Sequence, residues 1–158
     1  MLNCSKVSEG QPVTSVGDKL IHEAENIFKE KGHLTDEILS ALRFVYQTPL
    51  LPALDLTDNK AVTMVISPSG RKLYQVMGSS GKPYTCFLNS RYCSCPAYRY
   101  SVLLKEDHIL VNNGSPTCIH IIYLCKHVLA LRLSDAMGLT RTTNISDKEL
   151  TNMIVQMD

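Results

Sequence analysis

Two short motifs of cysteine and histidine constrain this chain more than any other feature of its sequence. Cys93 and Cys95 form a Cys-x-Cys pair, and Cys125 and His127 form a Cys-x-His pair. Structural zinc sites use four thiolate or imidazole ligands in a tetrahedron, and the two pairs together supply such a set. The sequence therefore predicts a closed zinc site formed by Cys93, Cys95, Cys125 and His127, with no open position for catalysis.

The residues around each pair indicate how the four ligands would meet. Residues two apart on a strand point to one face, so a strand end presents both thiolates together, and Pro96 stops that strand. Residues two apart on a helix diverge, so we expect Cys125 just before a helix and His127 in its first turn. The amides and positive dipole end of that helix would then face the thiolates.

Other interpretations of the cysteines stay open on the residues alone. A redox dithiol is one, although the chain lacks the Cys-x-x-Cys at a helix start that such sites use, and inert buried thiols are another. A second Cys-x-His, Cys118 and His120, competes with Cys125 and His127, but it opens a β-branched run rather than a clear helix. Cys86 is expected on a strand as a small buried residue, not as a ligand.

The rest of the sequence predicts an α+β fold, a small antiparallel β-meander with N-terminal and C-terminal helices on either side. Helices are indicated by apolar spacing, and strands by short apolar runs between turn sequences rich in Gly, Pro and Ser. Gly32 is placed to end the first helix, Pro49 to close the second, and Ser146 with Glu149 to form a capping box. The predicted helices are 16–31, 36–48, 97–105, 125–138 and one after Ser146, and the predicted strands are 61–66, 71–77, 84–88 and 91–95.

The chain of 158 residues is divided into four parts. Residues 1–14 are expected to be a flexible tail, 15–50 a helical pair, 51–140 the zinc-finger region and 141–158 a C-terminal helix. Within the third part, residues 111–124 resemble an insertion, either a native loop or a product of splicing. The first residues lack the apolar core of a signal peptide, and no apolar run approaches the roughly 18 residues of a membrane span.

The net charge of +1 hides an uneven distribution along the chain. Residues 1–58 and 106–158 are acidic overall, whereas residues 59–105 contain no Asp or Glu at all. Such a basic segment is typical of a surface for nucleic acid or for an acidic partner, although strands are poor in acidic residues in any case. Its basic residues are Lys60, Arg71, Lys72, Lys82, Arg91, Arg99 and Lys105.

The pattern Cys-x-Cys…Cys-x-His-x-x-Ala resembles the SWIM zinc-finger family, with Cys125 to Ala130 as its second half. The stretches 53–56, 66–80, 84–86 and 92–98 also resemble the small SWIM-domain subunits of the Shu complex. This resemblance implies a nuclear, non-enzymatic adaptor in homologous recombination and DNA repair, including meiosis. Such adaptors bind a RecA-like recombinase paralogue and help to load or stabilise recombinase filaments on single-stranded DNA.

The sequence therefore predicts two alternative functions. The first is the adaptor that the resemblance implies, which would touch single-stranded DNA through its complex and would involve no membrane. The second is a zinc module that binds nucleic acid directly. The chain has no Gly-x-x-x-x-Gly-Lys-[Ser/Thr] phosphate loop, so any use of ATP would lie with the partner, and we expect no enzymatic activity.

Overall fold

The structure is a computed structural model, and it describes residues 16–90, 92–100 and 124–157. The predicted tail 1–14, most of the segment 111–124 and the competing pair Cys118 and His120 lie outside these residues. In chain order the elements are α1 (Val16–Lys31), α2 (Asp36–Tyr46), α3 (Leu50–Asp58), β1 (Val62–Ile66), β2 (Lys72–Met77), β3 (Pro83–Phe87), β4 (Tyr92–Cys93), α4 (Pro96–Tyr98), α5 (Lys126–Ala136), β5 (Arg141–Asn144) and α6 (Asp147–Val155).

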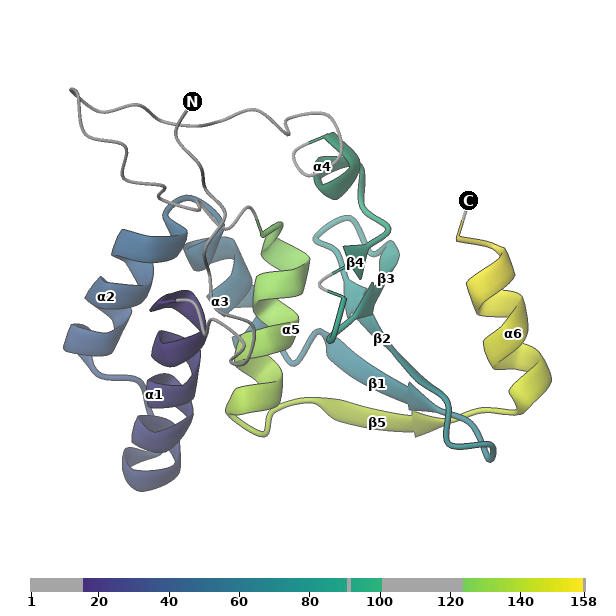
Figure 1. Cartoon of the computed structure of the whole chain (residues 1–158), viewed down its shortest axis with the longest axis horizontal. Helices are drawn as coiled ribbons and strands as arrows, with labels where there is room; N and C mark the ends of the chain where they lie inside the picture. The colour runs from purple at the N-terminus through teal and green to yellow at the C-terminus, as the bar shows by residue number, and fades with distance from the viewer. Residues whose placement is uncertain (1–15, 91, 101–123, 158) are drawn as a thin grey trace, which may run out of the picture.

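A five-stranded sheet in the order β4-β3-β2-β1-β5 forms the centre of the fold (Figure 1). The first four strands make the antiparallel meander that the sequence predicts, with Met64 opposite Tyr74, Tyr74 opposite Cys86, and Cys86 opposite Cys93. The α+β fold class is thus confirmed. The fifth strand was not predicted, and it runs parallel to β1, which makes the sheet mixed.

The sheet has one thickly covered face and one thinly covered face. On the first, strand residues such as Tyr74, Val76 and Cys86 share a buried core with α5, and α1, α2 and α3 pack behind α5 (Figure 1). On the second face, Val65 and Leu73 share a small separate core with Leu150 of α6. Strand residues alternate between the two faces, so β1, β2 and β3 each contribute to both cores.

The N-terminal helices follow the prediction, with one addition. Gly32 ends α1 in a left-handed conformation with φ +75°, a conformation that costs glycine little because it has no Cβ. The expectation that Pro49 closes the second helix is wrong: α2 ends at Tyr46, and Pro49 is the N-cap of α3. Helix α3 was not predicted, because Leu51 is exposed and Pro52 interrupts the apolar pattern.

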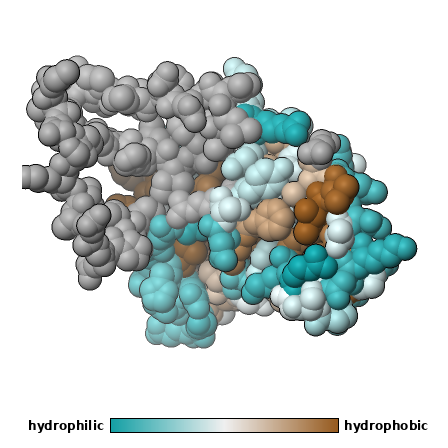
Figure 2. Space-filling model, turned by 45° about the vertical axis from the view of Figure 1, so that its right-hand side comes forward, coloured by the Kyte–Doolittle hydropathy of each residue, from teal (hydrophilic) through white to brown (hydrophobic). Residues whose placement is uncertain are grey.

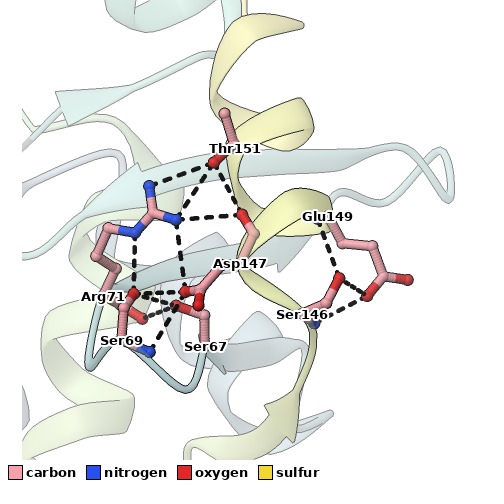
Figure 3. A network of polar contacts seen from close by, with 7 residues as sticks. All are labelled: Ser67, Ser69, Arg71, Ser146, Asp147, Glu149 and Thr151. Atoms are coloured by element: carbon pink, nitrogen blue, oxygen red, sulfur yellow. Dashed lines mark hydrogen bonds and ion pairs between the residues drawn. The ribbon is translucent and has the colours of Figure 1, made fainter.

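A polar network joins the start of α6 to the neighbouring turn between β1 and β2 (Figure 3). Ser146 and Glu149 form the predicted capping box. The Arg71 guanidinium donates to the Asp147 carboxylate and to the Thr151 hydroxyl, at 3.4 and 3.3 Å. The Ser69 hydroxyl also donates to Asp147. These bonds tie the turn between β1 and β2 to the first turn of α6.

Among the described residues, no helix combines the length and the apolarity that crossing a bilayer requires.

Candidate metal centre

The structure brings all four predicted ligands together. The ligand atoms of Cys93, Cys95, Cys125 and His127 lie within 4.8 Å of one another, which is close enough for one metal ion to bind them all. Cys93, Cys95 and His127 are almost fully buried, and Cys125 is partly exposed. Cys86, on the neighbouring strand, is buried as predicted and lies outside this group.

The first pair sits where β4 ends and α4 begins. Cys93 is the last residue of β4, and Cys95 is the N-cap of α4, which has Pro96 as its first residue. The backbone amide of Tyr98 donates to the Cys95 sulfur at 3.3 Å. The predicted helix over 97–105 is helical as far as it is described: α4 covers Pro96–Tyr98, Arg99 and Tyr100 continue it as a π-helical turn, and residues 101–105 lie outside the described part. Proline at the first helical position needs no amide partner, so it ends the strand and starts this turn.

The second pair opens α5 in the predicted way. Cys125 is the N-cap, its sulfur accepts a hydrogen bond from the Val128 amide at 3.5 Å, and His127 follows in the first turn. An N-terminal turn offers unpaired amides and a positive dipole end, and both stabilise thiolate charge. Leu124, the last residue of the predicted insertion 111–124, is 7% exposed and belongs to the main core.

The histidine ring is held in a place where it lacks ordinary partners. His127 is 4% exposed, and neither ring nitrogen has a hydrogen-bond partner among the described residues. The ring of Tyr84 packs against it, with centroids 4.5 Å apart and an interplanar angle of 39°. A buried polar atom without a partner destabilises a fold, and a metal ion bound to one ring nitrogen would remove that penalty for the nitrogen that it binds.

Tyr84 is the functional neighbour that the sequence analysis missed. It lies two residues before Cys86 on β3, so both side chains point to the face that carries the site. A search for aromatic residues on that face would have singled it out. The position of its ring over His127, however, depends on how α5 packs on the sheet, and no local pattern encodes that.

The thiols are unequal in acidity because they hydrogen-bond to one another. Hydrogen bonds from the thiols of Cys125 and Cys93 hold the pKa of the Cys95 thiol well below its usual range. The pKa of the Cys125 thiol is raised, because it hydrogen-bonds to Cys93 and to Cys95. The cluster therefore already favours an ionised Cys95, and ionised thiols are the form that binds a metal.

The donor set fits zinc, the two pairs close around one point, and a Cys-x-Cys at a strand end followed by a Cys-x-His at a helix start defines a SWIM-type zinc finger. The comparisons with known proteins agree with this class. No protein-family model matches the chain. Curated relatives do match it, and each bears the name zinc finger SWIM domain-containing protein 7.

The relative from Danio rerio is 39% identical over 145 residues, covering 92% of this chain and 94% of its own length. The relative from Homo sapiens is 40% identical over 141 residues, covering 89% of this chain and 91% of its own length. The relative from Mus musculus is also 40% identical over 141 residues, with 89% and 84% covered. The chain belongs to the family of zinc finger SWIM domain-containing protein 7.

Proposed function

We propose that this protein is a non-enzymatic, zinc-binding adaptor of homologous recombination in the nucleus. In this role it binds a RecA-like recombinase paralogue and promotes or stabilises recombinase filaments on single-stranded DNA, as the family resemblance implies. The observation that carries the proposal is the cluster of Cys93, Cys95, Cys125 and His127, whose four ligand atoms lie within 4.8 Å of one another and would together fill the tetrahedron of a zinc ion.

The geometry of the site supports a structural role for zinc rather than a catalytic one. Catalytic zinc keeps one position for water or substrate, whereas four protein ligands fill a tetrahedron. Cys93, Cys95 and His127 are at most 4% exposed, which leaves little access for a substrate. The ligands come from β4, the start of α4 and the start of α5, so a bound zinc ion would join these three elements.

Exposed apolar side chains support a protein partner. Phe44 of α2 is 84% exposed and Leu51 of α3 is 58% exposed, while α6 exposes Ile154 and Val155. Figure 2 brings the α6 side of the molecule forward and shows hydrophobic surface there, bordered by hydrophilic residues. Large exposed apolar groups are common at sites where another protein binds.

Affinity purification of the full chain from cells tests the proposal. We expect a RecA-fold ATPase to copurify, identified by mass spectrometry, and one zinc ion per chain in the purified protein. The His127→Ala variant should lose both, because it removes a ligand, whereas Cys86→Ser, a buried cysteine outside the ligand group, should keep both. Purification of the intact chain without any RecA-fold ATPase would contradict the adaptor role.

Direct binding of nucleic acid is a second candidate, and one observation favours it. Lys126 follows Cys125, Arg99 follows the α4 turn, and Lys82 lies 6.0 Å from the ring centre of Tyr84, which packs on His127. Within the described ranges, these three residues take part in no ion pair. Arg71, by contrast, is bound to Asp147, so its charge is already used within the fold.

A salt titration separates the two candidates. Direct binding predicts that the purified chain, without a partner, holds a single-stranded oligonucleotide at about 150 mM salt. Replacing Lys82, Arg99 and Lys126 with alanine should then abolish binding, while Lys72→Ala, on the far end of the sheet, should not. Lys72 is the better control than Arg71, because an Arg71 substitution also disturbs α6.

A further inference from the structure

The strand β5 leaves one side of the sheet open. It forms an end of the strand order and pairs only with β1, and all four of its residues, Arg141 to Asn144, are exposed. In Figure 1 it runs along the lower margin of the sheet, and no described element lies beyond it. An open strand edge is a template on which another extended chain can pair.

The backbone groups at this edge can be assigned from the register. The amide of Ile145 donates to the carbonyl of Ile66 at 3.0 Å, so the odd-numbered residues of this segment point their backbone groups toward β1. In a parallel pair, the intervening residues point both their N–H and their C=O away from the neighbouring strand. Thr142 and Asn144 therefore present two donors and two acceptors at the open edge.

This edge has few of the features that normally prevent pairing. It contains no proline and no lysine, and its register with β1 is unbroken from Arg141 to Asn144. Natural edges are commonly blocked by such residues or by bulges. The opposite edge of the sheet, β4, is only two residues long and is occupied by the metal centre.

The surroundings of the edge indicate which segment would fit. Arg141 stands at its N-terminal end, exposed and in no ion pair with any residue that the structure describes. A hollow of about 440 Å³, lined in part by Ile66, Pro68 and Ile145, lies beside its C-terminal end. The edge thus suits an extended segment with an acidic side chain near Arg141 and an apolar side chain near the hollow.

We propose that β5 accepts an extended β-strand of the recombinase paralogue, which pairs with the outward backbone groups of Thr142 and Asn144. This inference rests on the proposed adaptor function and adds the place and mode of contact. A strand suits the edge because its backbone supplies acceptors and donors in alternation, whereas a helix has already used its own. The acidic and apolar side chains at its two ends would fix the register.

Substitution with proline at one position tests the backbone contact. Thr142→Pro removes an amide that faces the open edge and leaves the bonds to β1 in place, a position that an edge strand tolerates. The matched control, Thr142→Ala, removes the side chain and keeps the amide. With the RecA-fold ATPase captured by the full chain as the probe, we expect Thr142→Pro to weaken binding about tenfold or more and Thr142→Ala to leave it nearly unchanged.

A second measurement on the unaltered protein does not depend on how the proline variant folds. In the complex, hydrogen exchange followed residue by residue by NMR should slow at the amides of Thr142 and Asn144. The amides of Thr143 and Ile145, which already bond to β1, should change less. Unchanged exchange at Thr142 and Asn144 in a stable complex would overturn the inference.

The outcomes separate this inference from the function on which it rests. If the wild-type chain captures no RecA-fold ATPase, both the adaptor function and the strand contact are wrong. If the wild type and a folded Thr142→Pro variant capture it equally well, the adaptor function stands and the strand contact is wrong. If the chain alone is a dimer that Thr142→Pro turns into a monomer, the edge pairs with a second copy, which also overturns the assignment to the paralogue.

Discussion

The helices α5 and α6 pack on opposite faces of the same sheet, but they are attached in different ways. Most of α5 is buried between the sheet on one side and α1 and α3 on the other; the buried residues are His127, Val128, Leu129, Ala130, Leu131, Leu133 and Ser134. Only Leu150 of α6 is buried, and a polar network joins its first turn to the turn between β1 and β2. α5 is therefore part of the main core, whereas α6 is attached to the sheet by one buried side chain and by hydrogen bonds at its N-terminal turn.

The local sequence signals for a helix are weak in α5, the more deeply buried helix, and strong in α6. α5 has almost no amphipathic stripe, because a helix that is covered on most sides needs apolar residues all round. α6 has a stripe, an acidic first turn and a complete capping box at Ser146. We infer that tertiary packing and the metal centre stabilise α5, whereas α6 depends on its own caps and on a few contacts.

The largest effect is expected from the loss of a metal ligand. Cys95→Ser or His127→Ala should abolish stoichiometric zinc binding and unfold the α5 side of the sheet, because structural zinc contributes roughly 10–16 kcal/mol in zinc-finger peptides. Zinc content measured by mass spectrometry and thermal unfolding followed by circular dichroism check this. Cys86→Ser is the control, and it should keep one zinc per chain. Equal zinc loss in Cys86→Ser and Cys95→Ser would show that the ligand assignment is wrong.

The metal centre and the meander could be predicted because their signals are local. Ser67 to Gly70 marks a turn between two apolar runs, and the Cys-x-Cys and Cys-x-His motifs have a spacing that is typical of metal ligands. The helix α3 and the strand β5 were missed for physical reasons. β5 reads Arg-Thr-Thr-Asn, with no apolar alternation, because neither of its faces is buried. A strand that exists only by pairing with β1 leaves no hydrophobic pattern to find.

The polar network around Arg71 was missed for a different reason. Arg71 and Asp147 are far apart in the sequence, and each alone is an ordinary surface charge. Arg71 belongs to the basic segment that was predicted to face nucleic acid or an acidic partner, yet the structure shows this side chain bound to α6. Charge along a sequence therefore overestimates the charge that a surface offers to a partner.

The second largest effect is expected from the single buried anchor of α6. Leu150→Ala should destabilise the docking of α6 by about 2–5 kcal/mol, because it removes the side chain that fills the small core beside Val65 and Leu73. Hydrogen exchange should accelerate in residues 147–155 and stay slow in α5. Ile154→Ala, at a partly exposed position, is the control and should change stability by less than about 0.5 kcal/mol. Equal acceleration in α5 would mean that the two helices unfold as one unit.

A smaller effect is expected from the cap of α6. Ser146→Ala removes the oxygen that accepts from the Glu149 amide at 3.2 Å, and it should destabilise the helix by about 1 kcal/mol. Ser146→Asp can still accept that hydrogen bond, so it should keep most of the stability. Exchange of the first-turn amides measures both variants. A Ser146→Asp variant as unstable as Ser146→Ala would show that the Leu150 contact, not the cap, decides whether α6 forms.

The smallest effect is expected at acidic pH, where Asp147 titrates. Hydrogen bonds from the hydroxyls of Ser69 and Ser67, with the Arg71 guanidinium nearby, lower its pKa from 3.8 to about 2. A lowered folded pKa means that the carboxylate stabilises the docked helix above pH 3.8, and that this contribution disappears as the pH falls through about 2. The carboxylate is half exposed, so the stabilisation that its ionised form supplies is modest.

The Asp147→Asn variant lacks this titration. The difference in hydrogen exchange of α6 between this variant and the wild type should therefore be constant near neutral pH and vanish toward pH 2. Metal ligands that protonate in acid affect both proteins alike, and a difference that persists unchanged to pH 2 would contradict the role of this carboxylate.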